Sequence, residues 1–323
     1  MKILITGCAG FIGYHLCNKL LATNKYEVYG IDNLNNYYDI ELKKSRIKEL
    51  KKKFKGFKFK KIDISNRNDI SRLFNKEKFT HIINLAAQAG VRFSIENPMP
   101  YVESNLIGFF NILDLSRTSK IDHLIFASTS SVYGDSKKFP LKETDNTDRP
   151  LSFYAATKKS NEVMAYSYSN IYGLPCTGLR FFTVYGPYGR PDMALYKFTK
   201  SIINKNRIEL FNKGNHIRDF TYVDDVTESI VKLINKPSKE KIPFEIYNIG
   251  NSKPEKLKLF LSIIEKTLGI NAKVKLVKLQ QGDVHKTHAD TKKILKKINY
   301  KPRTKINEGI SKFINWYKDY YKK

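Results

Sequence analysis

The sequence is short of cysteine and of long apolar runs, and each shortage excludes a class of protein. Three of the 323 residues are cysteines, Cys8, Cys17 and Cys176, and none of them stands in a Cys-x-x-Cys motif. This number and spacing argue against a disulfide framework and a structural zinc site, so we expect no bound metal. No apolar stretch reaches the roughly 20 residues of a membrane-spanning helix. We therefore expect a cytoplasmic protein that does not interact with a membrane.

Acidic residues are also scarce. The chain has 31 Asp and Glu residues against 58 Lys and Arg residues, a formal net charge of +27. Such a surplus attracts polyanions, and its densest part is residues 43–61, where Glu49 is the only acidic residue. This run is either a nucleic-acid surface or the solvated face of a helix. We favour the helix face because no aromatic-interleaved motif for RNA or DNA accompanies the run, and we expect no specific nucleic-acid partner.

Short apolar runs alternate with longer amphipathic runs in the first half of the chain. This alternation predicts an α/β fold, a Rossmann-type doubly wound parallel sheet with helices on both faces. We expect strands at residues 2–6, 27–31, 57–62, 81–85, 123–127 and 177–182, and helices at 11–22, 101–116 and 154–171.

The pattern changes after residue 186, where Pro187 and Pro191 interrupt it. Helices are expected at 195–203 and 223–234, and strands at 208–211 and 245–249. We predict a dinucleotide-binding domain of residues 1–182 with about 222–250. A smaller C-terminal α/β substrate-binding domain is predicted for about 183–221 and 251–323.

A glycine-rich loop, Gly7-Cys8-Ala9-Gly10-Phe11-Ile12-Gly13, joins the first strand to the first helix. In a dinucleotide site the first glycine permits a sharp turn, the second lets the backbone approach the pyrophosphate, and the third allows close helix–strand packing. The helix N-terminus then presents free N–H groups to the phosphates. Because strand and helix flank the loop as required, it predicts a dinucleotide site.

The second strand ends at Asp32, where a carboxylate can accept hydrogen bonds from the adenosine ribose hydroxyls and repel a 2′-phosphate. Asn33 follows, and no arginine stands beside Asp32. The sequence therefore favours NAD over NADP. Asp63 and Ile64, after the third strand, are predicted to flank the adenine.

Tyr154 and Lys158 are the candidates for proton transfer. Three tyrosines stand four residues before a lysine, at Tyr133, Tyr154 and Tyr196, so spacing alone selects none. Context favours Tyr154, because it begins a long helix and follows a hydroxyl-rich segment at residues 128–131. Four residues apart on a helix, the two side chains share a face. We expect the Lys158 ammonium to lower the pKa of the Tyr154 phenol, which would then serve as a general base.

These motifs together resemble the extended short-chain dehydrogenases/reductases over essentially the whole chain. Within that family, several segments resemble UDP-glucuronate 4-epimerases. They are residues 32–39 (DNLNNYYD), 90–98 (GVRFSIENP), 189–194 (GRPDMA) and 218–225 (RDFTYVDD), whereas the segment 128–134 (STSSVYG) belongs to the resemblance to the wider family. The resemblance implies NAD-dependent inversion at C4 of a UDP-uronic acid, UDP-glucuronate to UDP-galacturonate, through a transient 4-keto intermediate. It also implies a homodimer packed through the helices at 101–116 and 154–171.

The resemblance also assigns roles to residues. Tyr154 would be the base, Lys158 would hold the nicotinamide ribose, and Thr129 would hydrogen-bond the sugar O4. Ser130, Ser131 and Thr183 would receive the uronate carboxylate. Further cofactor contacts are implied at Leu85, Ala86, Ala87 and Asn105, and contacts with the nucleotide sugar at Arg190, Arg218 and Asp283.

Departures from related enzymes narrow the prediction. Dehydratases of this kind carry Asp-Glu where Ser130 and Ser131 stand, and UDP-glucuronate decarboxylases carry Glu in place of Ser131. Ala89 replaces a lysine found in many UDP-galactose 4-epimerases. Epimerisation of UDP-N-acetylglucosaminuronate or UDP-galactose and decarboxylation of UDP-glucuronate remain as alternatives. A non-enzymatic module that binds NAD or RNA is a further alternative, favoured by the basic surface but opposed by the intact set of Thr129, Tyr154 and Lys158.

Overall fold

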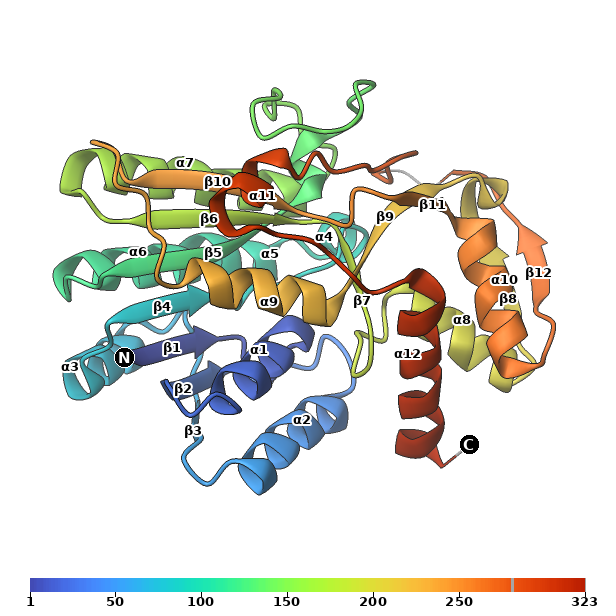
Figure 1. The fold of residues 1–323 in the computed structure, drawn as a ribbon, viewed down its shortest axis with the longest axis horizontal. Coiled ribbons are helices and arrows are strands. Elements are labelled where there is room, and N and C mark those ends of the chain that lie inside the picture. The colour runs from blue at the N-terminus through green and yellow to red at the C-terminus, as the bar shows by residue number, and fades with distance from the viewer. Residues whose placement is uncertain (280–281, 323) are drawn as a thin grey trace.

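A seven-stranded parallel sheet forms the centre of the protein (Figure 1). The computed structural model describes residues 1–279 and 282–322. The strand order is β10-β6-β5-β4-β1-β2-β3, with bounds β1 (Lys2–Thr6), β2 (Glu27–Asp32), β3 (Lys58–Lys61), β4 (His81–Asn84), β5 (His123–Thr129), β6 (Cys176–Phe181) and β10 (Phe244–Ile249). The order reverses between β1 and β4, and ligands of such sheets bind at the carboxyl ends beside this point.

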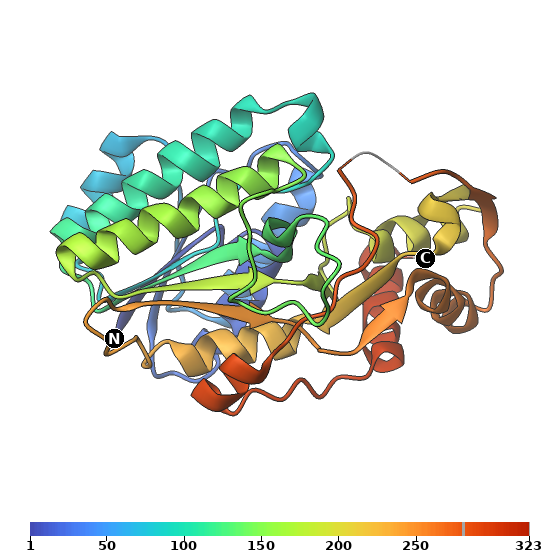
Figure 2. The same ribbon diagram turned by 90° about the horizontal axis from the view of Figure 1, so that it is seen from above.

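Helices cover both faces of the sheet, because its central strands are apolar on both sides. Every residue of β4 and β6 is buried, as expected for parallel strands between two helical layers. On one face pack α1 (Phe11–Leu21), α2 (Ile40–Lys53) and α9 (Val223–Leu233). On the other pack α3 (Arg67–Glu77), α6 (Phe109–Thr118) and α7 (Phe153–Tyr172). Figure 2 shows α6 and α7 side by side on one face and α9 on the opposite face. The predicted doubly wound fold is thus confirmed.

The helix predicted at residues 101–116 is wrong in detail. It consists of α5 (Met99–Tyr101), a π-helical segment (Val102–Gly108) and α6. In the wide π turn, the buried Asn105 side chain donates to Gln88 O and Thr157 Oγ1, at 3.0 Å each. Hydrophobic periodicity does not reveal such a turn, because the apolar face continues through it.

Beyond the carboxyl ends of the large sheet lies a second group of elements (Figure 1). The strands β7 (Thr183–Tyr185), β9 (Ile217–Tyr222) and β11 (Pro254–Lys256) form one small sheet, and β8 (Arg207–Leu210) pairs with β12 (Lys273–Leu276). The accompanying helices are α8 (Ala194–Ile203), α10 (Leu257–Leu268) and α12 (Ile306–Tyr321). In contrast, α11 (Lys292–Ile298) returns to pack against β10 and α9. The two-domain boundaries given above stay a prediction.

Three short helical segments complete the described elements. They are α4 (Phe93–Glu96), a 3₁₀ turn (Ser130–Tyr133) that follows β5 directly, and a second 3₁₀ turn (Phe211–Gly214) after β8. None of the helices in the described ranges combines the length and apolar character needed to cross a bilayer.

Candidate active site

A cavity of about 1030 Å³ opens at the carboxyl ends of the large sheet. It exceeds the roughly 300–1,000 Å³ typical of a site for one drug-sized molecule. The cavity brings together every site residue that the sequence predicted except Asn105, namely Gly7, Gly10, Phe11, Ile12, Gly13, Asp32, Asn33, Asp63, Ile64, Leu85, Ala86, Ala87, Thr129, Ser130, Ser131, Tyr154, Lys158, Thr183, Arg190, Arg218 and Asp283.

The glycine loop has the geometry that its motif predicts. Gly7 has a φ of 69°, a left-handed conformation that glycine adopts without steric cost. A Cβ on Gly13 would lie 2.2 Å from the Gly7 carbonyl oxygen, so α1 packs as closely as the third glycine allows. Gly10 is the N-cap of α1. The loop and the first N–H groups of α1 therefore border the cavity without side chains in between.

Backbone N–H groups hold the Asp32 carboxylate at the end of β2. Ala9 N donates to its Oδ2 at 3.1 Å and Leu34 N to its Oδ1 at 2.8 Å. Burial raises the pKa of Asp32, and these bonds and the charge of Lys43 oppose that rise. The neighbouring Asn33 amide donates to Asp63 Oδ2 at 2.8 Å, which links the ends of β2 and β3. Asp32, Asn33 and Asp63 thus form one polar wall of the cavity.

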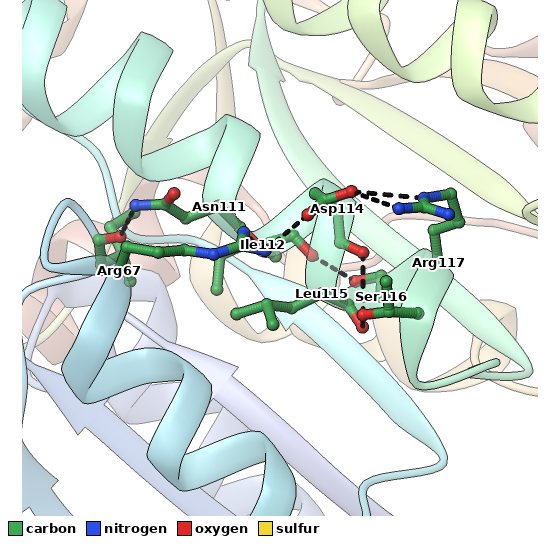
Figure 3. A network of polar contacts seen from close by, with 9 residues as sticks. Arg67, Asn111, Ile112, Asp114, Leu115, Ser116 and Arg117 are labelled. Atoms are coloured by element: carbon green, nitrogen blue, oxygen red, sulfur yellow. Dashed lines mark hydrogen bonds and ion pairs between the residues drawn. The ribbon is translucent and has the colours of Figure 1, made fainter.

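A polar network joins α3 to α6 (Figure 3) and contacts the segment that follows β3. Asn111 of α6 donates to Ile64 O at 2.9 Å and to Ser65 O at 3.1 Å. Arg67 of α3 donates to Asn111 O and to Asp114. Sequence reasoning did not single out Asn111, because an asparagine on a helix carries no local signal of a distant backbone partner.

Asn105 plays a comparable supporting part. It does not line the cavity; its Oδ1 accepts a hydrogen bond from Gln88 N at 2.8 Å, and its amide donates to Gln88 O. It therefore holds the segment after β4, whose residues Leu85, Ala86 and Ala87 do line the cavity.

Opposed effects set the pKa of the Tyr154 phenol. Burial raises this pKa, whereas the Arg190 charge and a hydrogen bond with Thr129 lower it. The Lys158 ammonium donates to Ala127 O at 2.9 Å, and burial lowers its pKa to about 8. The Lys158 ammonium is thus directed to a backbone carbonyl, and the Arg190 charge is one of the influences that lower the pKa of Tyr154. The role of Lys158 in tuning Tyr154 stays a prediction.

A buried ion pair fixes the catalytic elements relative to each other. Arg180 of β6 forms two hydrogen bonds with Glu162 of α7, at 2.8 and 2.9 Å. Ser128 Oγ, beside Thr129, donates to the same carboxylate at 2.6 Å. Glu162 lies two turns after Tyr154, so the network ties the end of β5 to the helix that carries the phenol. This network was absent from the sequence prediction, since its partners are distant in the chain.

Hydroxyl groups and a guanidinium line the same cavity as Tyr154. Thr129 Oγ1 donates to Ser131 Oγ at 3.2 Å and accepts from Ser131 N. Ser130 belongs to the same 3₁₀ turn, and Thr183 begins β7. Arg190 lies in the loop after β7, where it pairs with Asp192.

A cationic cluster lies at the far end of the cavity. Arg218 of β9 donates to Asp283 Oδ1 at 2.8 Å and to Val284 O at 2.6 Å. Arg92 lies 3.8 Å from the same carboxylate. Burial lowers the pKa of the adjacent His216 to about 4, and the Arg218 charge adds to the effect. Two guanidinium groups against one carboxylate leave a net positive site suited to phosphate groups.

Two members of the basic run at 43–61 are not solvated. Lys43 is 5% and Arg46 0% exposed, on the inner side of α2. Lys43 Nζ donates to Asn35 O at 2.7 Å, and burial lowers its pKa to about 8. Their spacing from Leu42, Ile47 and Leu50 marks this inner face and is the signal that could have found them. The run was predicted to be the solvated face of a helix. A helix is confirmed for residues 40–53, but Lys43 and Arg46 are buried rather than solvated.

Comparison with known proteins identifies the family. The family model described as GDP-mannose 4,6 dehydratase matches residues 4–313. Protein CapI of Staphylococcus aureus is 50% identical, over all of both chains. A probable UDP-glucuronate 4-epimerase of Rhizobium meliloti is 41% identical, over 100% of this chain and 98% of its own.

A solved structure has the same fold throughout. UDP-glucuronic acid 4-epimerase from Bacillus cereus, in complex with UDP-glucuronic acid and NAD, aligns with a TM-score of 0.93. The two sequences are 35% identical, and the alignment covers 99% of this chain and 100% of that one. The chain therefore belongs to the GDP-mannose 4,6 dehydratase family of extended short-chain dehydrogenases/reductases and, as the sequence motifs indicated, resembles its UDP-glucuronate 4-epimerases.

Proposed function

We propose that this protein is an NAD-dependent epimerase that interconverts UDP-glucuronate and UDP-galacturonate. The observation that carries the proposal is one cavity lined by Tyr154, by a cluster of uncharged hydroxyls and by the glycine loop. The resemblance to UDP-glucuronate 4-epimerases supports the same substrate.

The cofactor half of the cavity fits NAD. The glycine loop and the α1 N-terminus offer N–H groups to a pyrophosphate, and the Asp32 carboxylate suits ribose hydroxyls and repels a 2′-phosphate. The segment 85–87 and Lys158 would border the nicotinamide ribose, with Ile64 and Asp63 beside the adenine. Bound NAD supplies a reversible acceptor for the C4 hydride, so the enzyme consumes none of it.

Proton transfer falls to Tyr154. Its phenolate takes the proton of the sugar 4-hydroxyl as the C4 hydride leaves, and the sugar becomes a 4-ketone. The Thr129 hydroxyl, which donates to Ser131 Oγ and lowers the pKa of Tyr154, orients the oxygen at C4. The 4-keto sugar is planar at C4 and rotates so that its other face is presented. The phenol then returns the proton while hydride returns to that opposite face of C4. Reactant and product are then epimers, with no net oxidation.

Recognition of the carboxylate separates this activity from others in the family. Ser130, Ser131 and Thr183 are uncharged donors for a uronate carboxylate, and Arg190 adds a positive charge near Tyr154. A 4-keto uronate is a β-keto acid that can lose carbon dioxide, and a held carboxylate opposes that loss. The Asp-Glu pair of dehydratases is replaced by Ser130 and Ser131, so we do not propose dehydration despite the family's name.

The cationic end of the cavity is proposed to hold the UDP group. Arg218 and Asp283 are joined by a hydrogen bond, and Arg92 lies beside them. The guanidinium groups would neutralise the diphosphate, since charge-assisted bonds to phosphate are the strong ones.

Product analysis tests this function. Purified protein is incubated separately with UDP-glucuronate, UDP-N-acetylglucosaminuronate and UDP-galactose, and products are followed by proton NMR. We expect UDP-galacturonate from UDP-glucuronate, without added NAD. Formation of UDP-xylose or a 4-keto pentose would instead identify a decarboxylase, and preference for either other sugar would replace the proposed substrate.

We also propose a homodimer and a cytoplasmic location. Large apolar side chains are exposed on adjacent parts of α6 and α7 and on the π-helical segment, including Ile107, Phe110, Val163 and Tyr166. A second copy packed on this face would cover them. The three cysteines are free thiols, which supports a reducing compartment.

A further inference from the structure

Arg190 is held by a chain of side chains that comes from the opposite wall of the cavity. Its guanidinium forms two hydrogen bonds with the Asp192 carboxylate, at 3.0 Å from Nε and 2.5 Å from the terminal nitrogen. Tyr37 Oη donates to Asp192 Oδ2 at 3.1 Å. Tyr37 belongs to the loop after β2, only a few residues beyond Asp32, whereas Arg190 and Asp192 follow β7. The hydrogen-bonded residues Tyr37, Asp192 and Arg190 therefore join the loop after β2 to the loop after β7.

The position of Tyr37 is itself fixed by packing. Its ring lies 4.9 Å from that of Phe93, measured between centroids. A Cβ on Gly90 would lie 2.3 Å from the Tyr37 oxygen, so the hydroxyl occupies space that any larger residue at position 90 would fill. Tyr101 donates to Gly90 O and holds that segment in place. The Tyr37 hydroxyl thus has little freedom to leave Asp192.

A second connection anchors the same two loops. The buried Arg46 guanidinium donates to Ala9 O in the glycine loop and to Tyr188 O in the loop after β7, both at 2.7 Å. It also donates to Tyr38 Oη at 2.7 Å. His15 of α1 lies 2.8 Å from Pro187 O, to which its Nε2 donates. These bonds fix the backbone of the loop after β7, so the remaining freedom of Arg190 lies in its side chain.

The position of the Arg190 guanidinium matters because nearby charges set the pKa of the Tyr154 phenol. Arg190 and Asp192, in the loop after β7, carry opposite charges and line the same cavity as the phenol. Tyr101 faces it from α5, with ring centroids 6.1 Å apart, and Thr129 from β5. Lys158 lies one turn away on α7, with its ammonium on Ala127 O. Among these groups, the Arg190 guanidinium lines the cavity with Tyr154, and its charge lowers the pKa of the phenol.

We propose that Tyr37 and Asp192 are positioning residues that hold the Arg190 guanidinium beside Tyr154 and so set the pH range of the epimerase. The proposal rests on the proposed function of Tyr154 as the base. Neither residue needs to touch the reacting atoms, because both act through Arg190. The sequence alone had assigned a role only to Arg190.

Tyr37→Phe is the first test, since it removes one hydroxyl and keeps the ring that packs on Phe93. The rate of epimerisation of UDP-glucuronate is measured against pH, together with the NAD content of the protein. We expect kcat to fall roughly tenfold at neutral pH, as for loss of one charge-assisted hydrogen bond. The rising limb of the pH profile should move to higher pH because a less ordered Arg190 favours the phenolate less. Tyr26→Phe, in the turn before β2 and away from the cavity, is the matched control and should change neither quantity.

Asp192→Asn separates positioning from a direct effect of charge. The Asp192 charge by itself raises the pKa of Tyr154, so its removal with Arg190 unmoved would shift the rising limb to lower pH. If positioning dominates, the loss of the two hydrogen bonds between Arg190 and Asp192 lets the guanidinium move away from Tyr154. We therefore expect the rising limb of the pH profile to move to higher pH. A shift to lower pH would overturn the proposal.

A double-mutant cycle completes the test. If Tyr37 acts through Arg190, Tyr37→Phe should add almost nothing to Arg190→Gln, since coupled residues are not additive. Full additivity, an unshifted limb in Tyr37→Phe, or loss of NAD from that variant would each overturn the proposal. Failure of the proposed function is distinct, because the wild-type protein would then not interconvert UDP-glucuronate and UDP-galacturonate at all.

Discussion

At the scale of single residues, the proposed chemistry depends on the protonation states of the Tyr154 phenol and the Lys158 ammonium. The Tyr154 phenol is made less acidic by burial and more acidic by Arg190 and Thr129. The Lys158 ammonium is buried without a carboxylate partner, which lowers its pKa to about 8. The phenol must therefore lose its proton before it can act as a base, and the buried ammonium loses its proton more readily than a solvated lysine does.

Tyr154→Phe should abolish most of the activity. The variant keeps the ring and loses the oxygen that accepts the 4-hydroxyl proton, so kcat should fall by about 10²- to 10⁴-fold, the usual contribution of a general base. NMR product analysis gives the rate, and absorbance of cofactor released on denaturation gives NAD content, which should not change. A variant within a few-fold of wild type would show that another group takes the proton.

Lys158 should give the cofactor-free protein a characteristic pH dependence. Burial lowers its pKa from 10.5 to about 8 in the folded state. Between these values the unfolded chain binds the extra proton, so stability relative to Lys158→Met should rise with pH from 8 to 10. The rise should be up to roughly 3 kcal/mol. Urea unfolding of both proteins at pH 7 and pH 10 measures it, and an unchanged difference would mean that the ammonium is solvated.

At the scale of elements, sequence patterns predicted the strands and helices of the large sheet but not the contacts between them. Apolar periodicity and the glycine loop place α1 and β2 correctly, since both signals are local. The π-helical segment at Val102–Gly108 and the Ser128–Glu162–Arg180 network were missed. Both depend on partners that fold into contact from distant parts of the chain. The burial of Arg46 was missed for the same reason. A basic run predicts a solvated surface, and the contacts of Arg46 with Ala9 and Tyr188 form only in the folded chain.

The exposed faces of α6 and α7 lead to a prediction about assembly. Phe110 is 45% and Val163 57% exposed, on helices that pack side by side. A charge at each position would be buried without a partner in a dimer, at a cost of several kcal/mol. The double variant Phe110→Asp, Val163→Asp should therefore sediment as a monomer in analytical ultracentrifugation, whereas we expect wild type to sediment as a dimer.

Leu259→Asp provides the matched control for this experiment. Leu259 is 44% exposed on α10, away from the α6 and α7 face, and its substitution should leave the dimer intact. A wild-type protein that sediments as a monomer at micromolar concentration would contradict the proposed dimer.

At the scale of the whole molecule, buried histidines should make the fold sensitive to acid. His123 in β5 donates from Nδ1 to Ile234 O at 2.9 Å and accepts from Thr177 Oγ1 at 2.8 Å. It thereby joins β5, β6 and the end of α9 in its neutral form. Burial lowers its pKa from 6.5 to about 4, so the unfolded chain binds more protons between these values and stability falls as pH falls from 6.5 to 4.

The His123→Asn variant isolates this effect. Asparagine retains an amide donor for Ile234 O but does not titrate. The variant should be less stable than wild type at pH 7, and the difference should shrink by up to about 3 kcal/mol at pH 4.5. Thermal unfolding followed by circular dichroism at both pH values measures the change. A constant difference would show that His123 is not kept neutral by the fold.

The central claim is that hydride leaves C4 and returns to the other face of the same carbon, while Tyr154 moves the proton. UDP-glucuronate carrying deuterium at C4 tests this most directly, with the product examined by NMR. The account predicts UDP-galacturonate that retains deuterium at C4 in ordinary water, with no accumulation of reduced cofactor. Hydrogen from solvent at C4 of the product would contradict it, because the label would then have left as a proton rather than a hydride.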